Sequence, residues 1–170
     1  GAPKSGTQLN SQKILTAAGI SYKDFSKVEY LSYAESVELM KNRQLDVTLL
    51  SSGAGVAALR DLATSQKVVF LTIPADIVKK IDDPAYQVGV IPANTYEGQS
   101  ADVQTIAVQN FLVTREGVST DTVYRMTKSM FENLDQMVAA HAAAKEIKKE
   151  NAISSLPAPL HPGAEKYYRE

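Results

Sequence analysis

The stretch LDVTLLSSGAGVAALRDLA, residues 45–63, passes from an apolar run through a glycine turn into a helical pattern. Residues 47–50 are predicted to form a buried strand, residues 51–55 a tight turn, and residues 56–63 a helix. A short apolar run without strict alternation is typical of a strand that is covered on both faces. The stretch therefore indicates a strand–turn–helix unit of an α/β protein.

The same alternation continues on both sides of this unit. KVVFLTI (67–73) and residues 86–91 are predicted to be further buried strands, and Pro74 suits the first turn of a helix between them. Before the unit, residues 34–40 carry apolar positions at helical spacing. Buried strands that alternate with helices favour a mostly parallel sheet with helices on both faces, which makes three layers.

The N-terminal segment GAPKSGTQLNSQKILTAAGI, residues 1–20, is a turn that leads directly into a helix. Ser5, Gly6 and Thr7 are predicted to cap this helix, which should run to about Ala18 and end at Gly19. The free N–H groups at a helix N-terminus favour a carboxylate, and Ser and Thr hydroxyls add donors. The segment is therefore a candidate anion site, and a plain helix cap is the alternative.

A second polar turn repeats this chemistry at Ser52, Gly53 and Gly55. Two such turns at the carboxyl ends of parallel strands would face one crevice, although a turn that serves only packing is the alternative. Tyr96, on a loop that leaves a strand, is expected to wall a ligand pocket with its ring and to donate with its hydroxyl. A partly buried core tyrosine is the alternative there.

No catalytic, cofactor or metal site is expected from the remaining motifs. The nucleotide-binding patterns GxGxxG and GxxxxGK[ST] are missing from the sequence, which disfavours nucleotide binding. His141 and His161 have no partners at the spacing of a metal site or a catalytic triad. The sequence therefore predicts a protein without enzymatic activity, and a small α/β enzyme is one of the alternatives.

The pattern changes after about residue 104. Residues 105–113 read as a longer extended stretch, and a long helix is predicted over about 120–141, followed by a further helical segment, a proline-rich segment and a last short helix. One stripe of the long helix is apolar and is expected to be core: Val123, Met126, Met130, Leu134 and Met137. We therefore predict a sheet-containing part, residues 1–104, and a helical part, residues 105–170.

Composition narrows the possible partners. The 170 residues carry 18 Lys and Arg against 19 Asp and Glu, so a nucleic acid or an anionic membrane is not expected as a partner. Cysteine is absent, which excludes disulfides, thiol catalysis and cysteine-based metal sites. The longest apolar run is about six residues, far short of the ~20 that a membrane-spanning helix needs.

An ordered series of segments resembles the TAXI subfamily of solute-binding receptors of TRAP transporters. The series comprises GAPKSGTQLNSQKILTAAGI, LDVTLLSSGAGVAALRDLA, GVIPANTYEGQSADVQTIAVQNFLV, MTKSMFENLDQM, AAHAAAKEI and LPAPLHPGAEKYYRE. The resemblance implies the second lobe of a type II periplasmic-binding-protein fold, found outside the cytoplasm. It also implies a small organic anion or amino acid, glutamate-like, as ligand, and a TRAP transporter membrane subunit as partner.

The resemblance also carries over to single positions. Ser5, Gly6 and Thr7 match the helix start that faces the ligand cleft, and the second turn falls on Ser52, Gly53 and Gly55, where Gly55 replaces the proline of the family pattern. Tyr96 matches the tyrosine of a Pro-Ala-Gly-Thr-Tyr motif in which Asn94 replaces glycine, a residue that also tolerates left-handed geometry.

Two further expectations follow from the resemblance. Because TAXI receptors are nearly twice this length, the chain is expected to be a fragment whose long helix exposes apolar surface, which self-association could cover. A ligand-sensing effector domain of a transcription regulator, which shares this fold, is the other alternative.

Overall fold

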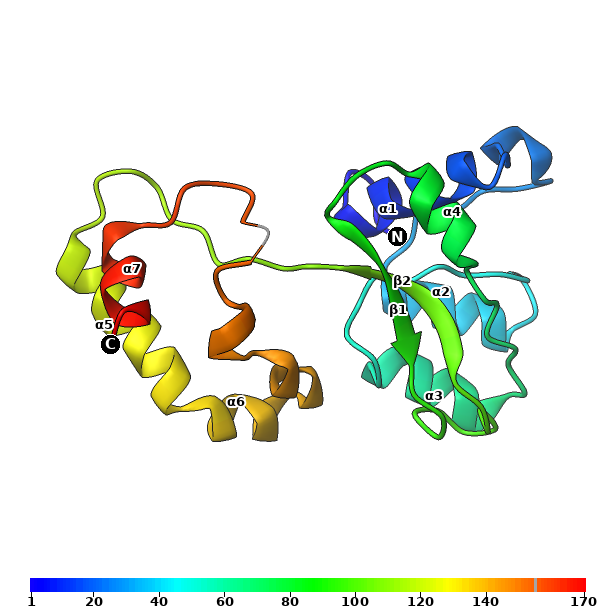
Figure 1. Ribbon diagram of the computed structural model, residues 1–170. Helices are drawn as coiled ribbons and strands as arrows, with labels where there is room; N and C mark the ends of the chain where they lie inside the picture. Colours follow the sequence, from blue (N-terminus) through cyan, green and yellow to red (C-terminus); the bar gives the residue numbers. More distant parts are fainter. Residues whose placement is uncertain (155) are drawn as a thin grey trace. The chain divides into compact units, whose positions relative to one another are not determined.

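A computed structural model describes residues 1–154 and 156–170, and it divides the chain into two compact units. The first unit is Gly1–Val108 and the second is Gln109–Glu170 (Figure 1). The two units are described separately below. The expected division at residues 104 and 105 concerns the lobes of a larger fold and stays a prediction.

Two α-helices of the first unit begin at serines that cap them. Ser5 accepts a hydrogen bond from the Gln8 amide, and Gly19 leaves the first helix with φ of +75°. Ser32 and Glu35 form a reciprocal capping box at the start of another helix. The predicted helices are therefore confirmed, as α1 (Gly6–Ala17), α2 (Tyr33–Lys41), α3 (Ala57–Ser65) and α4 (Ala75–Lys80). The 3₁₀ helix η1 (Tyr22–Asp24), which lies between α1 and α2 in the chain, was not predicted.

The sheet of the first unit has two antiparallel strands, β1 (Tyr86–Ile91) and β2 (Val103–Val108). Tyr86 lies opposite Val108, and Ile91 lies opposite Val103. The strand predicted at residues 86–91 is thus confirmed. The mostly parallel, three-layered sheet is not formed in the part of the chain that the structure describes. A hairpin loop joins β1 to β2, and strands joined in this way pair antiparallel.

The other two predicted strands, residues 47–50 and 67–73, form no regular ladder among the described residues. Segment 67–73 meets β2 at one point, where the Ile73 amide donates to the Gln104 carbonyl at 3.1 Å. Its side chains are covered on one side only, because Val69 and Leu71 are 78% and 69% exposed. An apolar run predicts a strand that is buried on both faces. Segment 67–73 is covered on one face only, so this prediction was wrong.

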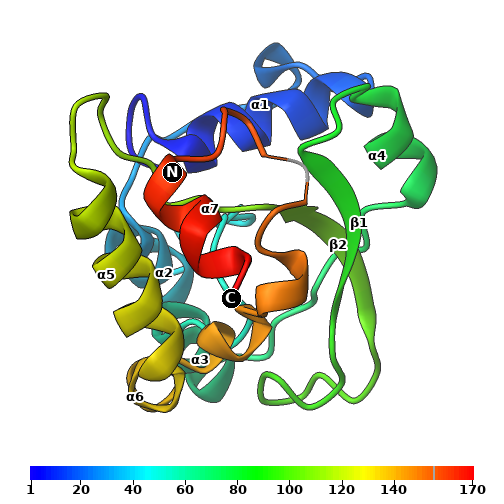
Figure 2. The ribbon, with the colours of Figure 1, turned by 60° about the vertical axis from the view of Figure 1, so that its left-hand side comes forward.

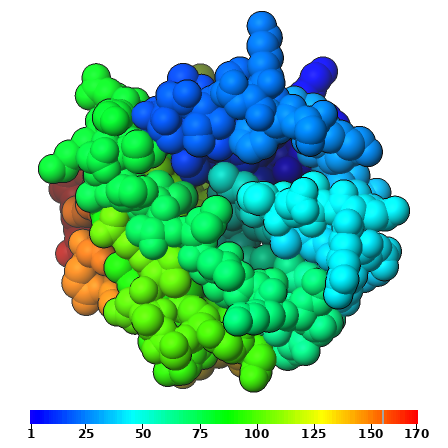
Figure 3. Space-filling model, turned by 90° about the vertical axis from the view of Figure 1, so that its right-hand side faces the viewer, coloured from blue at the N-terminus to red at the C-terminus, as the bar shows by residue number. Residues whose placement is uncertain are grey.

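The core of the first unit lies mainly where α2 packs on α3. Val37 of α2 and Leu62 of α3 are each 2% exposed. Lys41 and Asp61 form an ion pair of 2.7 Å across the same two helices. Figure 3 shows one face of this unit, with its N-terminal residues (blue) next to residues near 45 (cyan). The other buried apolar residues of the unit are Ile14, Ala63, Val78 and Tyr96.

The second unit is helical. Its elements are α5 (Thr120–Glu132), α6 (Leu134–Ala140), the 3₁₀ helices η2 (Ala142–Glu146) and η3 (Lys149–Asn151), and α7 (Pro162–Tyr168). The last short helix is confirmed as α7. The prediction of one helix over 120–141 was wrong, because the helix is interrupted at Asn133. The Asn133 side chain donates a hydrogen bond to the Ser129 carbonyl in the preceding turn. The helical segment expected after it is likewise replaced by the two short 3₁₀ turns.

Helix α7 packs closely against α5 (Figure 2). Gly163 is buried in this contact, and a Cβ atom there would lie 2.3 Å from the Thr120 carbonyl oxygen. Phe131 of α5 stacks on Tyr167 of α7 with ring centroids 5.5 Å apart. This helix pair is the packed centre of the second unit.

The apolar stripe of the predicted long helix is only partly buried. Val123 is buried, whereas Met126 and Met137 are 54% and 37% exposed. The expectation that the whole stripe is core was therefore wrong. Within the described residues, no helix is both long enough and apolar enough to cross a membrane.

Candidate functional site

The N-terminal turn presents hydrogen-bond donors at the start of α1. The Ser5 Oγ accepts from the Gln8 amide at 3.2 Å, so the Ser5 hydroxyl proton stays available. Gly6 and Thr7 are the first two residues of α1, whose amides have no acceptor within the helix. The turn can therefore offer one hydroxyl and two backbone N–H groups to an acid.

The Thr7 side chain does not add a donor, which differs from the expectation. Thr7 is 6% exposed, and its Oγ1 lies 2.9 Å from the hydroxyl oxygen of Tyr33. The Tyr33 hydroxyl donates its single proton to the Ser51 carbonyl at 2.5 Å. Thr7 must then donate to Tyr33, so the hydroxyl of Thr7 serves the fold and only its amide remains for a ligand.

A second set of hydrogen bonds also ends on Ser51. The Asn10 side-chain nitrogen (Nδ2) donates to the Ser51 Oγ at 2.9 Å, and the Tyr86 hydroxyl donates to the Asn10 Oδ1 at 2.7 Å. Helix α1 is thereby tied to the residue that precedes Ser52 and Gly53. The two predicted polar turns thus lie on connected parts of the same unit, joined through Tyr33 and Asn10.

The second turn has a backbone that excludes proline at position 55. Gly55 has φ of +79°, whereas the proline ring fixes φ near −65°. The replacement of the family's proline by Gly55 therefore goes with a different backbone conformation of the turn. The Gly55 amide donates to the hydroxyl oxygen of Tyr96 at 2.9 Å, which connects this turn to the loop between β1 and β2.

Tyr96 is buried through its ring and retains a free hydroxyl proton. It is 5% exposed and stacks on Phe70 with ring centroids 4.9 Å apart. Since its oxygen accepts from Gly55, the proton can still be donated. A surface hollow of about 490 Å³ lies beside Tyr96, lined by Arg60 and Thr64 of α3 and by residues 94–98. Tyr96 is therefore a buried core residue that also lines the hollow.

The Tyr96 loop is held by a buried glutamine. The Gln99 side-chain nitrogen donates to the carbonyls of Ile91, Pro92 and Ala101, and its oxygen accepts from the Tyr96 amide. Asn94 has φ of +63°, the left-handed geometry that asparagine tolerates. The position of Tyr96 therefore depends on Gln99.

An ion pair flanks Tyr86, at the outer end of this network. Lys13 contacts Asp83 at 2.6 Å and lies over the Tyr86 ring, 4.7 Å from its centroid. The hydrogen bond from Lys13, followed by one from the Ala85 amide, lowers the pKa of Asp83 below its ordinary value. The same contact raises the pKa of Lys13. Both groups are therefore charged at neutral pH.

The two histidines act as helix caps. The His161 Nδ1 accepts from the Gly163 amide at 3.1 Å at the start of α7, and its Nε2 lies 3.1 Å from the Val118 carbonyl. His141 accepts from the Ala143 amide at the start of η2. These contacts give each histidine a structural role.

Four residues of this region were missed by the sequence predictions: Asn10, Tyr33, Arg60 and Gln99. Thr7 and Tyr33 are 26 positions apart, and Gly55 and Tyr96 are 41 apart, so no local pattern connects them. The one local signal was Ser32, a capping serine that fixes where α2 begins and hence where Tyr33 points.

A comparison with protein families matches the chain from end to end. The sequence model of the NMT1-like family matches residues 1–170. This family is periplasmic-binding-protein-like, and its members are generally extracellular or periplasmic binding proteins. It indicates a solute-binding function outside the cytoplasm in general terms, and it suggests a periplasmic-binding-protein-like fold. The chain belongs to the NMT1-like family.

Proposed function

We propose that this chain is the ligand-binding part of an extracytoplasmic solute receptor of the TAXI type. It binds a small carboxylate or amino acid and delivers it to a TRAP-type membrane transporter, without catalysis. Residues 1–104 are then the second lobe, and residues 105–170 return to a first lobe. The family match supports the solute-binding role, and the ordered resemblance of the whole chain supports the finer assignment.

The observation that carries the proposal is the link Thr7–Tyr33–Ser51. It fixes the start of α1 relative to the second turn through two hydrogen bonds, of 2.9 Å and 2.5 Å. Donors that are held in place before a ligand arrives lose little freedom on binding, which favours affinity. The α1 amides, the Ser5 hydroxyl and the Tyr96 hydroxyl then supply the hydrogen bonds that an acid group requires.

The test uses Gly6, because its amide can be deleted without breaking the helix. Proline is favoured at the first position of a helix, and Ser5 already has the extended backbone that a following proline requires, with φ of −80° and ψ of 160°. Gly6→Ala is the matched control, since a Cβ at Gly6 meets nothing within 4 Å and the amide is kept.

Isothermal titration of the 170-residue chain with L-glutamate, succinate and glutarate measures the effect. We expect binding of at least one of these acids, and we expect Gly6→Pro to weaken it by about tenfold or more, the worth of one charge-assisted hydrogen bond. Gly6→Ala should stay within about twofold of the parent chain. Failure of the parent chain to bind any of these acids, or equal affinities for the two variants, would contradict the proposal.

A further inference from the structure

The hollow beside Tyr96 contains one charge of each sign from its lining residues. Arg60 lines it from α3 and Glu97 lines it from the hairpin loop. It is an open surface hollow of about 490 Å³. The chemistry of these two side chains therefore bears on which ligand the region accepts.

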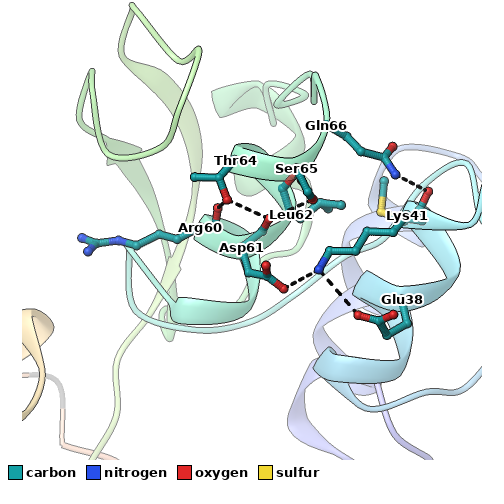
Figure 4. Close-up of polar contacts among 9 residues, drawn as sticks. Glu38, Lys41, Arg60, Asp61, Leu62, Thr64, Ser65 and Gln66 are labelled. Carbon is teal, nitrogen blue, oxygen red and sulfur yellow. Dashed lines mark hydrogen bonds and ion pairs between the residues drawn. The ribbon is translucent and has the colours of Figure 1, made fainter.

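Arg60 has no carboxylate partner among the described residues. The neighbouring Asp61 is engaged by Lys41 at 2.7 Å, and Lys41 also contacts Glu38 at 3.5 Å. Figure 4 shows the Arg60 side chain extended away from this group. Within residues 1–154 and 156–170, no carboxylate therefore compensates the charge of the Arg60 guanidinium.

The Arg60 guanidinium lies against the second polar turn. A Cβ atom built on Gly55 would be 2.8 Å from a terminal nitrogen of Arg60, so only the absence of a side chain lets the two approach. Gly55 is also the residue whose amide binds the Tyr96 hydroxyl. The cation therefore lies next to the hydroxyl that has a proton to donate.

Glu97 is likewise without an ion-pair partner in the described part of the chain, and no contact of 4.0 Å or less pairs it with Arg60. A ligand with two negative groups and no positive one would satisfy Arg60 and be repelled by Glu97. A ligand that carries a carboxylate beside an ammonium satisfies both.

We propose that Arg60 and Glu97 bind the zwitterionic head of an α-amino acid. The planar guanidinium pairs with the α-carboxylate in two parallel hydrogen bonds, the Tyr96 hydroxyl donates to the same carboxylate, and Glu97 accepts from the α-ammonium. This inference rests on the proposed function and narrows its ligand class, because a plain carboxylate leaves Glu97 unsatisfied.

The test compares L-glutamate with glutarate, the same five-carbon diacid without the ammonium group. Isothermal titration of the 170-residue chain is expected to show L-glutamate binding about tenfold tighter or more, since one charge-assisted contact is lost with glutarate. Glu97→Gln should abolish this preference by weakening L-glutamate alone. Arg60→Gln should weaken both ligands about tenfold or more.

Both substituted residues are exposed, so the variants should keep the circular dichroism spectrum and melting temperature of the parent chain. Glu116→Gln and Lys67→Gln, exposed charges elsewhere on the chain, are the matched controls and should change neither affinity. Equal affinities for the two acids, or no effect of either Arg60→Gln or Glu97→Gln, would overturn this inference and leave the proposed function standing. Absence of binding by both acids and by succinate would overturn the two together.

Discussion

The hydroxyl of Tyr33 donates a hydrogen bond of 2.5 Å to the backbone carbonyl of Ser51. This contact joins the first residue of α2 to the segment that leads into α3. Because Thr7 donates to the same hydroxyl, three separate stretches of the chain meet at one oxygen atom.

Removing that oxygen should destabilise the first unit. Tyr33→Phe leaves the buried Thr7 hydroxyl and the Ser51 carbonyl without their partner, which costs about 1–3 kcal/mol in the free energy of unfolding. Urea denaturation followed by circular dichroism measures this loss. Tyr30→Phe is the matched control, because Tyr30 is 43% exposed, and it should stay within about 0.5 kcal/mol of the parent chain. Equal stabilities of the two variants would show that the bridge contributes nothing.

The buried amide of Gln99 should be intolerant of a carboxylate. Gln99→Glu replaces a nitrogen that donates to three carbonyls with an oxygen that repels them, at a cost of about 3 kcal/mol. Amide exchange at Gly55 should then become faster, since the Tyr96 loop loses its anchor. Acidification should partly restore stability, because the protonated carboxyl can donate again. Gln87→Glu, on the exposed side of β1, is the control, and an equal loss there would refute the role given to Gln99.

The contact between α5 and α7 should not accept a side chain at Gly163. A Cβ atom would approach the Thr120 carbonyl oxygen at 2.3 Å and the Tyr124 amide nitrogen at 2.7 Å, and both are rigid backbone atoms. We expect Gly163→Ala to cost about 1–3 kcal/mol and to weaken the near-ultraviolet signal of the tyrosines packed there. Gly6→Ala, which meets nothing within 4 Å, should be close to neutral. A Gly163→Ala chain of unchanged stability would mean that the helices are not in this contact.

The Lys13–Asp83 pair should stabilise the first unit over the whole neutral range. The folded pKa of Asp83 is lowered from 3.8, so its contribution is present above that value and is lost as the pH falls through the folded pKa. The pKa of Lys13 is raised from 10.5, so its contribution is present below that value and is lost as the pH rises through the folded pKa. Lys13→Met should therefore raise the Asp83 midpoint toward 3.8, as followed by carboxyl NMR. Lys67→Met is the control and should leave the pH midpoint of the Asp83 titration unchanged. If Lys13→Met also left that midpoint unchanged, Lys13 and Asp83 would not be coupled.

The sequence predicted the parts of the fold that depend on neighbouring residues. Ser5 and Gly19 delimit α1 because capping involves groups only a few positions apart. The antiparallel pairing of β1 with β2, in which Tyr86 lies opposite Val108, was not predicted. The pattern of apolar residues within a strand does not show which strand it pairs with. Similarly, Asn133 interrupts the long helix through a hydrogen bond to its own preceding turn, which competes with an otherwise continuous apolar stripe.

The sequence pointed to only part of the candidate region, and the contacts that Asn10, Tyr33 and Gln99 make there were missed. The polar turns at 5–7 and 52–55 and the tyrosine at 96 were found from helix starts and loop positions. The prediction that the Thr7 hydroxyl donates to a ligand was wrong. A hydroxyl has one proton to donate, and Thr7 donates its proton to the hydroxyl oxygen of Tyr33. No spacing rule gives that result, as the partner is 26 residues away.

The backbone conformation of Gly55 carries an evolutionary consequence. Its φ of +79° lies in the left-handed region, and a proline there would require a turn of different hand. The Arg60 guanidinium, which fills the space beside it, is the flexible end of a long side chain and can move aside. NMT1-like sequences that share this turn should therefore keep glycine or asparagine at position 55 whatever residue stands at position 60.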